Sequence, residues 1–254
     1  MKGRHLPRAT KAGTAPYGAA GAPCWIGVPG IDELLPDGVR YGNQIMCMGD
    51  TGIGKTVLAA QFLYEGLLVG DRCIYVACDE SPESMRMNMA GLRIGTLAYE
   101  RANRLMFLDA YGRERSTEPF SVSSPNDLDE YFASERLAIK HVGTDRPVRL
   151  VVDSLSTIFG TADRSAILAF NRIRLRFLTA HGVLTLDNYV TGLLDDQTLA
   201  GLSHAYPLIL KFSYHESNGD MQRVLQLGKL RSGMFSGQKR NFRIDKRVGI
   251  VAQG

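Results

Sequence analysis

"GDTGIGKT", Gly49 to Thr56, is the stretch of sequence that decides the fold. It satisfies the pattern G-x-x-x-x-G-K-[ST] and stands directly after an apolar run and directly before a helical one. Glycines let the backbone curl so that successive N–H groups point at phosphate oxygens, and the start of the next helix adds favourable partial charge. The sequence therefore predicts a loop that binds the phosphates of a nucleotide.

We expect the nucleotide to contact the whole loop and the start of the following helix. The residues concerned are Gly49, Asp50, Thr51, Gly52, Ile53, Gly54, Lys55, Thr56 and Val57. In a loop of this kind the lysine, Lys55, reaches the β- and γ-phosphates. The Thr56 hydroxyl then ligates the Mg²⁺ that accompanies a triphosphate.

A second anchor for Mg²⁺ is expected in "VRLVVDSLS", where Asp153 closes an apolar strand. Its carboxylate can hold the metal directly or through water. Capping of the next turn is an alternative role for an aspartate at a strand end. Together with the loop, the pattern favours the metal role, with Thr56 and Asp153 as ligands.

Hydrolysis also needs a carboxylate that orients or deprotonates water near the γ-phosphate. Asp79 and Glu80 follow the apolar run "CIYVAC", which we expect to form the strand next to the loop strand. They should then emerge at the carboxyl edge of the sheet, where ligands bind. The alternative is that one of them caps the helix that begins at Ser81-Pro82, and both roles are compatible.

Continuous apolar runs after Trp25 predict strands that are buried on both faces. They are "QIMCM" (44–48), "CIYVAC" (73–78), "LMFLDA" (105–110), "VRLVVD" (148–153) and "GVLTLD" (182–187). Helical stretches are expected at Lys55–Leu68, Pro82–Leu92, Asn126–Lys140 and Asp163–Ala180. This order predicts an α/β fold with a mostly parallel central sheet flanked by helices. After Tyr206, two strand-like runs joined by "SNGD" predict a C-terminal antiparallel hairpin.

Composition places the chain among folded globular proteins, with 254 residues, 44% hydrophobic and 22% charged. No apolar run approaches the ~18 residues of a membrane span, and the first 24 residues lack the apolar core of a secretory signal. We therefore expect a cytoplasmic protein with no membrane association. The four cysteines show no C-x-x-C spacing, which favours buried thiols over a disulfide frame or a zinc site.

The net charge of +4 is unevenly distributed along the chain. Residues 1–24 hold four Lys or Arg and no acid, and residues 229–254 hold seven against Asp245 alone. Residues 1–24 are also rich in Gly, Ala and Pro without apolar periodicity. We interpret them as a flexible basic arm, and residues 25–254 as one domain.

Several blocks of the sequence together resemble the KaiC-like branch of the RecA/RadA ATPases. They are "GVPGIDELLPDGVRYGNQIMCMGDTGIGKTVLAAQFLYEGL", "YVACDESPES", "LVVDSLS", "LGKLRSG" and "FRIDKRVGIV", and they cover roughly residues 26–252. The resemblance implies a single RecA-like P-loop NTPase core that binds ATP and Mg²⁺ as cofactors. It also implies that Asp79 and Glu80 are catalytic; the commoner pair is Glu-Glu, and we favour Glu80 as the base. ATP and GTP stay open as alternatives.

The same resemblance implies a finger, a Lys-x-Arg on a late strand that reaches the γ-phosphate bound by the neighbouring subunit. Lys229 and Arg231 match it, which implies a homo-oligomeric ring, usually of six subunits. Independently, charge on the transferring phosphoryl group needs a cation, and an arginine from a neighbour makes activity depend on assembly. The alternative is a pair of charges on one face of an exposed strand. The following loop, "SGMFSGQKR", departs from the family pattern.

Binding of nucleic acid is weakly supported by the sequence. RecA-type recombinases hold DNA with loops after the strands that correspond here to "LVVD" and "GVLTLD". The first loop offers Arg164, and from Phe177 to Leu210 there is no Lys or Arg but there are Asp187, Asp195 and Asp196. DNA contacts, if made, would use residues 1–11 or "GQKRNFRIDKR", where Phe242 is the aromatic residue among the charges.

Two helical patterns have structural interpretations. Met85, Met89 and Leu92 are spaced as a core stripe. Arg172, Arg174 and Arg176 are interpreted as a solvated helix face, because on a helix they spread over an arc; a nucleic-acid patch is the alternative.

Two classes of function are consistent with the sequence. The first is a ring-forming ATPase with hydrolysis completed by the neighbour's finger. The alternative is a nucleotide-gated binding module, or a DNA-binding accessory protein related to RadA paralogues, with little turnover. The sequence does not identify a protein partner.

Overall fold

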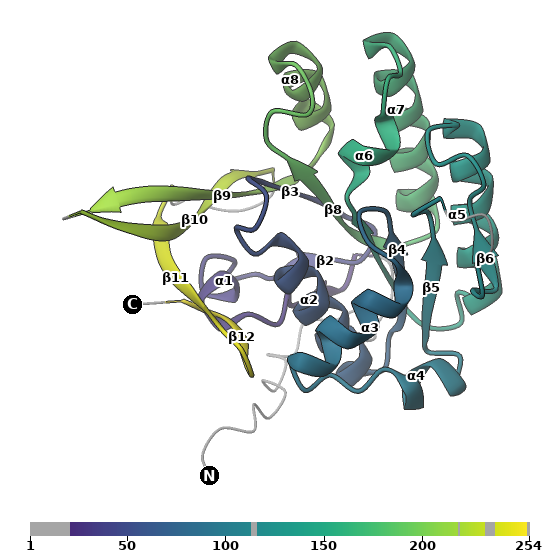
Figure 1. The fold of residues 1–254 in the computed structure, drawn as a ribbon, viewed down its shortest axis with the longest axis horizontal. Coiled ribbons are helices and arrows are strands. Elements are labelled where there is room, and N and C mark those ends of the chain that lie inside the picture. The colour runs from purple at the N-terminus through teal and green to yellow at the C-terminus, as the bar shows by residue number, and fades with distance from the viewer. Residues whose placement is uncertain (1–20, 113–115, 218, 232–236, 253–254) are drawn as a thin grey trace.

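A computed structural model describes residues 21–112, 116–217, 219–231 and 237–252 of the chain. Within this part, ten strands form one sheet in the order β12-β11-β10-β9-β3-β8-β7-β4-β5-β6 (Figure 1). The bounds are β3 Gln44–Gly49, β4 Arg72–Ala77, β5 Leu105–Asp109, β6 Phe120–Ser121, β7 Val148–Asp153, β8 Leu184–Val190, β9 Leu208–Ser217, β10 Asp220–Leu230, β11 Lys239–Asp245 and β12 Gly249–Ala252. A separate pair, β1 Pro23–Cys24 and β2 Val39–Arg40, is antiparallel.

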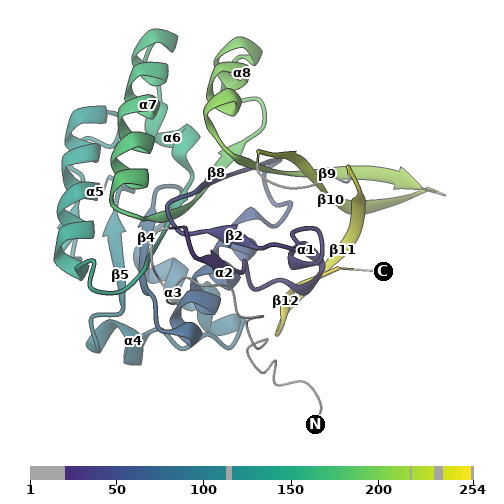
Figure 2. The ribbon, with the colours of Figure 1, turned by 180° about the vertical axis from the view of Figure 1, so that it is seen from behind.

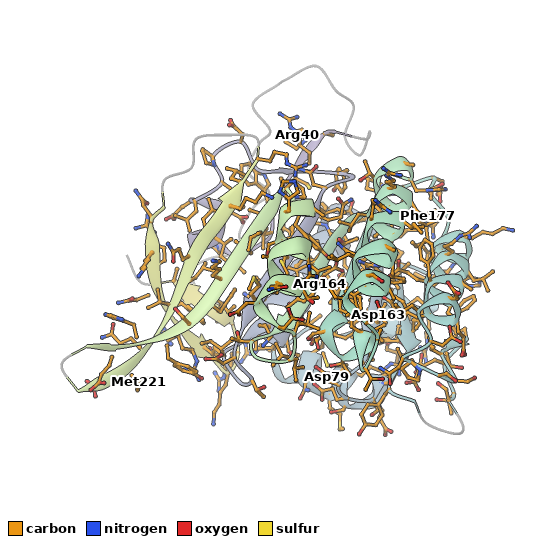
Figure 3. The ribbon with its side chains drawn as sticks, turned by 90° about the horizontal axis from the view of Figure 1, so that it is seen from above. Arg40, Asp79, Asp163, Arg164, Phe177 and Met221 are labelled. Carbon is orange, nitrogen blue, oxygen red and sulfur yellow. The ribbon has the colours of Figure 1, made fainter. Side chains whose placement is uncertain are left out.

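In the spatial order of the sheet, every pair of neighbouring strands between β9 and β6 is parallel. The pairs β9–β10, β10–β11 and β11–β12 are antiparallel. The mostly parallel sheet and the C-terminal antiparallel hairpin predicted from the sequence are both confirmed. The hairpin β9–β10 projects from the body, and Met221 marks its far end, on the opposite side of the molecule from Phe177 (Figure 3). Two further antiparallel strands, β11 and β12, extend the sheet beyond the hairpin.

Helices cover both faces of the sheet (Figures 1 and 2). Their bounds are α1 Pro29–Asp32, α2 Lys55–Val69, α3 Pro82–Gly91, α4 Leu97–Arg101, α5 Leu128–Val142, α6 Leu155–Phe159, α7 Arg164–Ala180 and α8 Asp196–Ala205. One buried cluster joins α1, α2 and α3 to the sheet, and we call this side the α2 face. A second cluster joins α5, α6, α7 and α8 to the other side, the α8 face.

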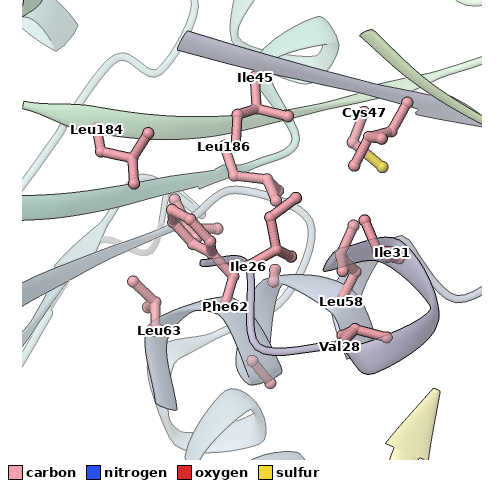
Figure 4. Packing of buried hydrophobic residues seen from close by; sticks show 14 of the residues in the cluster. Ile26, Val28, Ile31, Ile45, Cys47, Leu58, Phe62, Leu63, Leu184 and Leu186 are labelled. Carbon is pink, nitrogen blue, oxygen red and sulfur yellow. The ribbon is translucent and has the colours of Figure 1, made fainter. Parts of the chain in front are cut away.

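Strand β3 shows why the core strands read as continuous apolar runs. Its side chains alternate between the faces: Ile45 and Cys47 lie in the cluster of the α2 face, and Met46 lies in that of the α8 face. Figure 4 shows Ile45 and Cys47 packed toward Leu58 of α2. Because helices cover both faces, every position along the strand is apolar or closely packed.

The predicted helices are found close to their predicted bounds, and α8 is a helix that sequence analysis missed. Its segment buries only Thr198 and Leu202, so its sequence carries no apolar stripe of helical period. Met85 and Met89 are buried and Leu92 packs against the same cluster, which confirms the predicted core stripe.

The predicted flexible arm, residues 1–24, lies mainly outside the described residues. Its last part belongs to the fold: Pro23–Cys24 pair with Val39–Arg40, and the side chains of Ala22 and Cys24 are buried. All four cysteines are free and buried, as the sequence indicates. Among the described helices, none is both long enough and apolar enough to span a membrane.

The prediction of a solvated arginine face on α7 is wrong for Arg174. Arg172 and Arg176 are exposed, but the Arg174 side chain is 0% exposed and forms ion pairs with Glu135 of α5 at 2.9 Å and Asp187 of β8 at 2.8 Å. The guanidinium compensates two buried carboxylates that would otherwise lose their hydration without replacement. Asp187 is therefore part of the core and adds no charge to the loop that follows β8.

Candidate functional site

The loop Gly49–Gly54 leads from the carboxyl end of β3 into α2. A Cβ at Gly49 would lie 2.8 Å from both the Cβ and the carbonyl oxygen of Phe212, so a larger residue does not fit there. Gly52 has φ +76° and Gly54 has φ +121°, backbone conformations that side-chain-bearing residues rarely adopt. The three glycines therefore allow the tight curl that the motif predicts.

Lys55 is the first residue of α2, and its side chain folds back into the loop. Its Nζ donates hydrogen bonds to the carbonyl oxygens of Gly49 at 2.7 Å and Asp50 at 2.8 Å. The residue is 6% exposed, and this burial lowers the pKa of the ammonium, opposed by the charges of Asp153, Asp50 and Asp79, among others. The cation is thus held inside the loop by two backbone carbonyl groups.

Asp153 ends β7, and its carboxylate is held from two sides. Oδ2 accepts a hydrogen bond from the Tyr75 hydroxyl at 2.6 Å, and Oδ1 accepts one from Asn188 Nδ2 at 2.8 Å. Burial holds the pKa of Tyr75 well above its usual range, so the phenol keeps its proton and donates it. Asp153 is 7% exposed, and it lies at the carboxyl edge of the sheet, as Gly49 does.

Asp79 and Glu80 follow β4 at the same edge but face different partners. The prediction that this strand lies next to the loop strand is wrong, because β8 and β7 lie between β3 and β4 in the sheet. Asp79 is exposed; its backbone N–H donates to the Asp153 carbonyl oxygen at 3.3 Å, and its Oδ1 accepts from Thr157 Oγ1 at 2.5 Å. The Glu80 carboxylate accepts from the Ser84 hydroxyl and from Asn88 Nδ2, both on α3. Neither acid is the N-cap of α3: that role belongs to Ser81, whose side chain accepts from the Ser84 N–H.

Lys229 and Arg231 lie together at the C-terminal end of α8. Lys229 Nζ donates to the carbonyl oxygens of Ser203 and His204, both at 2.9 Å, and Arg231 Nη2 donates to that of His204 at 2.9 Å. Helix α8 packs on the α8 face, whereas Lys55 and α2 lie on the other face of the sheet. The two cations are thus brought together with each other, but not with the loop of their own chain.

The side chains of Thr56 and Asp153 suit Mg²⁺ that is also bound by phosphate oxygens. Among the described residues, no group of three or more His, Cys, Asp or Glu side chains is placed to hold a metal ion. Thr56 is the second residue of α2 and is half-buried. Mg²⁺ is commonly bound by one or two carboxylates, with phosphate oxygens and water completing its octahedron, and this pattern fits Thr56 and Asp153.

Residues in the segments considered for nucleic-acid binding have partners within the fold. Phe242 is 4% exposed and packs edge-on against Phe212 with ring centroids 5.2 Å apart, so it is not available for stacking on a base. Arg164 donates a hydrogen bond to Gln197 at the start of α8. Asp195 caps α8 by accepting from the N–H groups of Gln197 and Thr198.

Sequence analysis missed Tyr75, Asn188 and Thr157, which hold the predicted carboxylates. Tyr75 and Asn188 are fully buried polar side chains within strands, next to Asp153 in space. The signal in the sequence was slight. Tyr75 lies in an otherwise apolar run, and Asn188 directly follows Asp187 in a strand; both carry hydrogen-bonding groups that need a partner when buried. Which partner each finds depends on the order of strands in the sheet.

Comparison with known proteins gives a consistent result. A family model described as "ATPase: KaiC" matches residues 24–253. UPF0273 protein PH0284 of Pyrococcus horikoshii is 29% identical over 235 residues, covering 89% of this chain and 92% of that protein. A UPF0273 protein of Thermotoga maritima is 28% identical over 233 residues, covering 89% of this chain and 93% of that protein. The crystal structure of KaiC-like protein PH0186 from Pyrococcus horikoshii shares the fold, with a TM-score of 0.74 and 24% identity over 92% of this chain and 100% of that chain.

Proposed function

Because the chain belongs to the KaiC ATPase family, we propose that it binds ATP with Mg²⁺ and hydrolyses it in a ring of identical subunits. The observation that carries the proposal is the common placement of the glycine loop, Lys55 and the buried Asp153 carboxylate at one edge of the sheet. Ligands of open α/β sheets bind at this carboxyl edge. The UPF0273 and KaiC-like relatives support the fold and the family rather than a particular reaction.

In this proposal the loop residues 49–57 bind the phosphates, and Lys55 exchanges its two carbonyl contacts for phosphate oxygens. Thr56 and Asp153 hold Mg²⁺, which when bound neutralises charge on the β- and γ-phosphates. The neighbouring chain supplies Lys229 and Arg231. Their position across the sheet from their own loop supports action on the next subunit's phosphate.

Asp79 is the better candidate for the acid that orients or deprotonates water. Its carboxylate is exposed, has one side-chain donor, and its charge acts on Lys55. The oxygens of Glu80 accept hydrogen bonds from two side chains of α3, which turn it along that helix. We therefore assign Glu80 the role of fixing α3 against the site, and this reverses the preference drawn from the sequence.

Substitution of the two acids tests the proposal. Asp79→Asn should lower the rate of phosphate release by about 10²-fold or more, since a positioned base contributes about 10²–10⁴-fold. Glu80→Gln should lower it less, and both variants should bind ATP normally. Glu83→Gln is the matched control, because Glu83 is an exposed acid that follows the pair closely in sequence, in the first turn of α3. Unchanged turnover in both Asp79→Asn and Glu80→Gln would remove the acid pair from the mechanism.

A nucleotide-gated binding module is the second candidate. It is favoured by the contacts of Lys229 and Arg231 with α8, because a finger held by its own chain leaves the neighbouring site incomplete. Native mass spectrometry with and without ATP and Mg²⁺ distinguishes the two. Assembly that depends on nucleotide, with turnover insensitive to Asp79→Asn and Glu80→Gln, would favour the module. A chain that stays monomeric under all conditions would exclude the ring.

A further inference from the structure

We propose that Tyr75 and Asn188 are positioning residues that set how tightly the Asp153 carboxylate binds Mg²⁺. This inference rests on the metal role proposed above for Asp153. It extends the site from the end of β7 to the two strands beside it in the sheet, β4 and β8. Each contributes one neutral hydrogen-bond donor to one carboxylate oxygen.

Tyr75 reaches Asp153 diagonally across neighbouring strands. Its partner in the register is Val151, and Asp153 lies two residues further along β7, so all three side chains point to the same face of the sheet. The phenol is 0% exposed, and its ring packs against Phe107 with centroids 5.8 Å apart. A side chain held this firmly keeps its hydroxyl 2.6 Å from Oδ2 and so restricts rotation of the carboxylate.

Asn188 holds the other oxygen from the opposite side. Its Nδ2 donates to Oδ1 at 2.8 Å, and the side chain is 0% exposed. Its own Oδ1 is one of the few buried side-chain atoms among the described residues that have no hydrogen-bond partner. Buried polar atoms in proteins are almost always paired. An acceptor left open beside a metal-binding carboxylate is suited to a water molecule in the coordination shell of Mg²⁺.

Two neutral donors orient the carboxylate without cancelling its charge. A lysine or arginine in their place would compensate the negative charge that attracts the metal. Each Asp153 oxygen also keeps a lone pair for the metal or a water molecule bound to it. Partners that orient a metal ligand in this way are commonly worth about 10- to 100-fold in metal affinity.

The test measures Mg²⁺ affinity rather than turnover. Binding of the fluorescent analogue mant-ATP is titrated with Mg²⁺ and repeated in EDTA. For Tyr75→Phe and for Asn188→Leu, we expect the Mg²⁺ concentration at half-maximal enhancement of binding to rise about 10-fold or more. Affinity for mant-ATP in EDTA should stay unchanged, because the loop is intact. A general loss of stability would instead weaken binding in both conditions.

Tyr131→Phe is the matched control. Tyr131 is also fully buried, and its hydroxyl donates to the Glu135 carboxylate at 2.7 Å, on the other face of the sheet. The variant Tyr131→Phe loses the same kind of hydrogen bond, but it should leave the Mg²⁺ titration unchanged. If Tyr75→Phe and Asn188→Leu shift the titration no more than Tyr131→Phe does, the inference is overturned. Tyr75 and Asn188 lie on different strands, so the two substitutions affect folding at different places. If only one of the two variants folds, that variant is sufficient for the test.

Asp153→Asn separates failure of this inference from failure of the proposed function. If Asp153→Asn leaves the Mg²⁺ dependence of mant-ATP binding as it is in the unmodified chain, the metal role of Asp153 is wrong and the inference falls with it. If Asp153→Asn weakens the Mg²⁺ dependence while both neighbouring variants retain it, only the positioning role is wrong. A parallel weakening in all three variants supports both.

Discussion

The two faces of the sheet carry different halves of the proposed ATPase site. The α2 face holds Lys55, the first residue of α2, within the glycine loop. The α8 face holds Lys229 and Arg231, which donate to carbonyl oxygens at the end of α8. Because the sheet lies between them, Lys229 and Arg231 are separated from the loop of their own chain. This separation is the reason for proposing that they act on a neighbouring subunit.

The contacts at the end of α8 hold the finger without neutralising it. The C-terminal end of a helix carries partial negative charge, which stabilises nearby cations by about 0.3–1 kcal/mol. No carboxylate of the described residues forms an ion pair with Lys229 or Arg231. A phosphate carries a full negative charge, so it can compete with these carbonyl groups for both cations.

Mixing variants of the two faces should give the largest effect. Lys55→Ala and Arg231→Ala should each lower the rate of ATP hydrolysis by about 10³-fold or more. In an equal mixture, an interface works when one subunit brings the intact loop and the next brings the intact finger. About a quarter of interfaces then qualify, since each half is intact with a chance of about one half. Phosphate release measured against mixing ratio should therefore recover toward about a quarter of the unmodified rate.

The control for this experiment is Arg247→Ala, which removes an exposed arginine next to β11. It should keep nearly full activity alone and in mixtures. A mixture of Lys55→Ala and Arg231→Ala that stays inactive, although native mass spectrometry detects mixed assemblies, would contradict action between subunits. The two faces would then serve unrelated roles.

Buried arginines give a second comparison of the two faces. On the α2 face, Arg149 pairs with Asp71 at 2.7 Å, and the Tyr41 hydroxyl also donates to Asp71. On the α8 face, Arg174 alone bridges two carboxylates. Removing one partner of a buried pair costs about 3–5 kcal/mol. The cost should be larger for the arginine that leaves two carboxylates behind.

Arg174→Met should therefore lower the free energy of unfolding by about 5 kcal/mol, and Arg149→Met by about 3 kcal/mol. For a chain of this size the first corresponds to a fall in melting temperature of about 10 °C or more. Urea unfolding and calorimetry measure both variants under the same conditions. An equal loss in both would mean that the second carboxylate on the α8 face finds compensation elsewhere.

The sequence predicted the features that depend on neighbouring residues. The loop 49–56, the strands of β3 and β7, and the hairpin after Tyr206 all follow from local spacing, apolar runs and turn chemistry. Arg174 and Phe242 were misjudged because their burial depends on partners far along the chain. Arg174 meets Glu135, 39 residues away, and Phe242 meets Phe212 across the sheet.

The roles of the paired side chains were harder to predict. The resemblance named Asp79 and Glu80, but the contacts with Thr157 and α3 that distinguish them appear only in three dimensions. The donors on Asp153 come from strands β4 and β8, which precede and follow β7 in the sequence. Their meeting depends on strand order, which the local pattern does not specify.

The smallest expected effect on the free energy of unfolding concerns Asp32, a carboxylate on the α2 face. It is held by backbone amides rather than by an arginine. Asp32 accepts hydrogen bonds from the N–H groups of Ile26 at 2.8 Å and Gly27 at 3.1 Å. Burial, partly opposed by these two bonds, raises the pKa of Asp32 from 3.8 to about 6. Between these pH values the folded chain binds more protons than the unfolded chain, so this group lowers the free energy of unfolding as pH rises from about 4 to about 6.

Asp32→Asn should remove that slope and stabilise the chain above pH 6. The pKa difference is worth about 3 kcal/mol, and loss of one acceptor costs about 1 kcal/mol, which leaves a gain of about 1–2 kcal/mol. Urea unfolding at several pH values from about 4 to about 8 measures it, with the exposed Asp37→Asn as control. Asp71 and Asp187 have an arginine where Asp32 has amides, so of these three carboxylates only Asp32 should gain from losing its charge. If Asp32→Asn is instead less stable than the unmodified chain at neutral pH, the two backbone amides compensate the Asp32 carboxylate for its lost hydration as well as an arginine would.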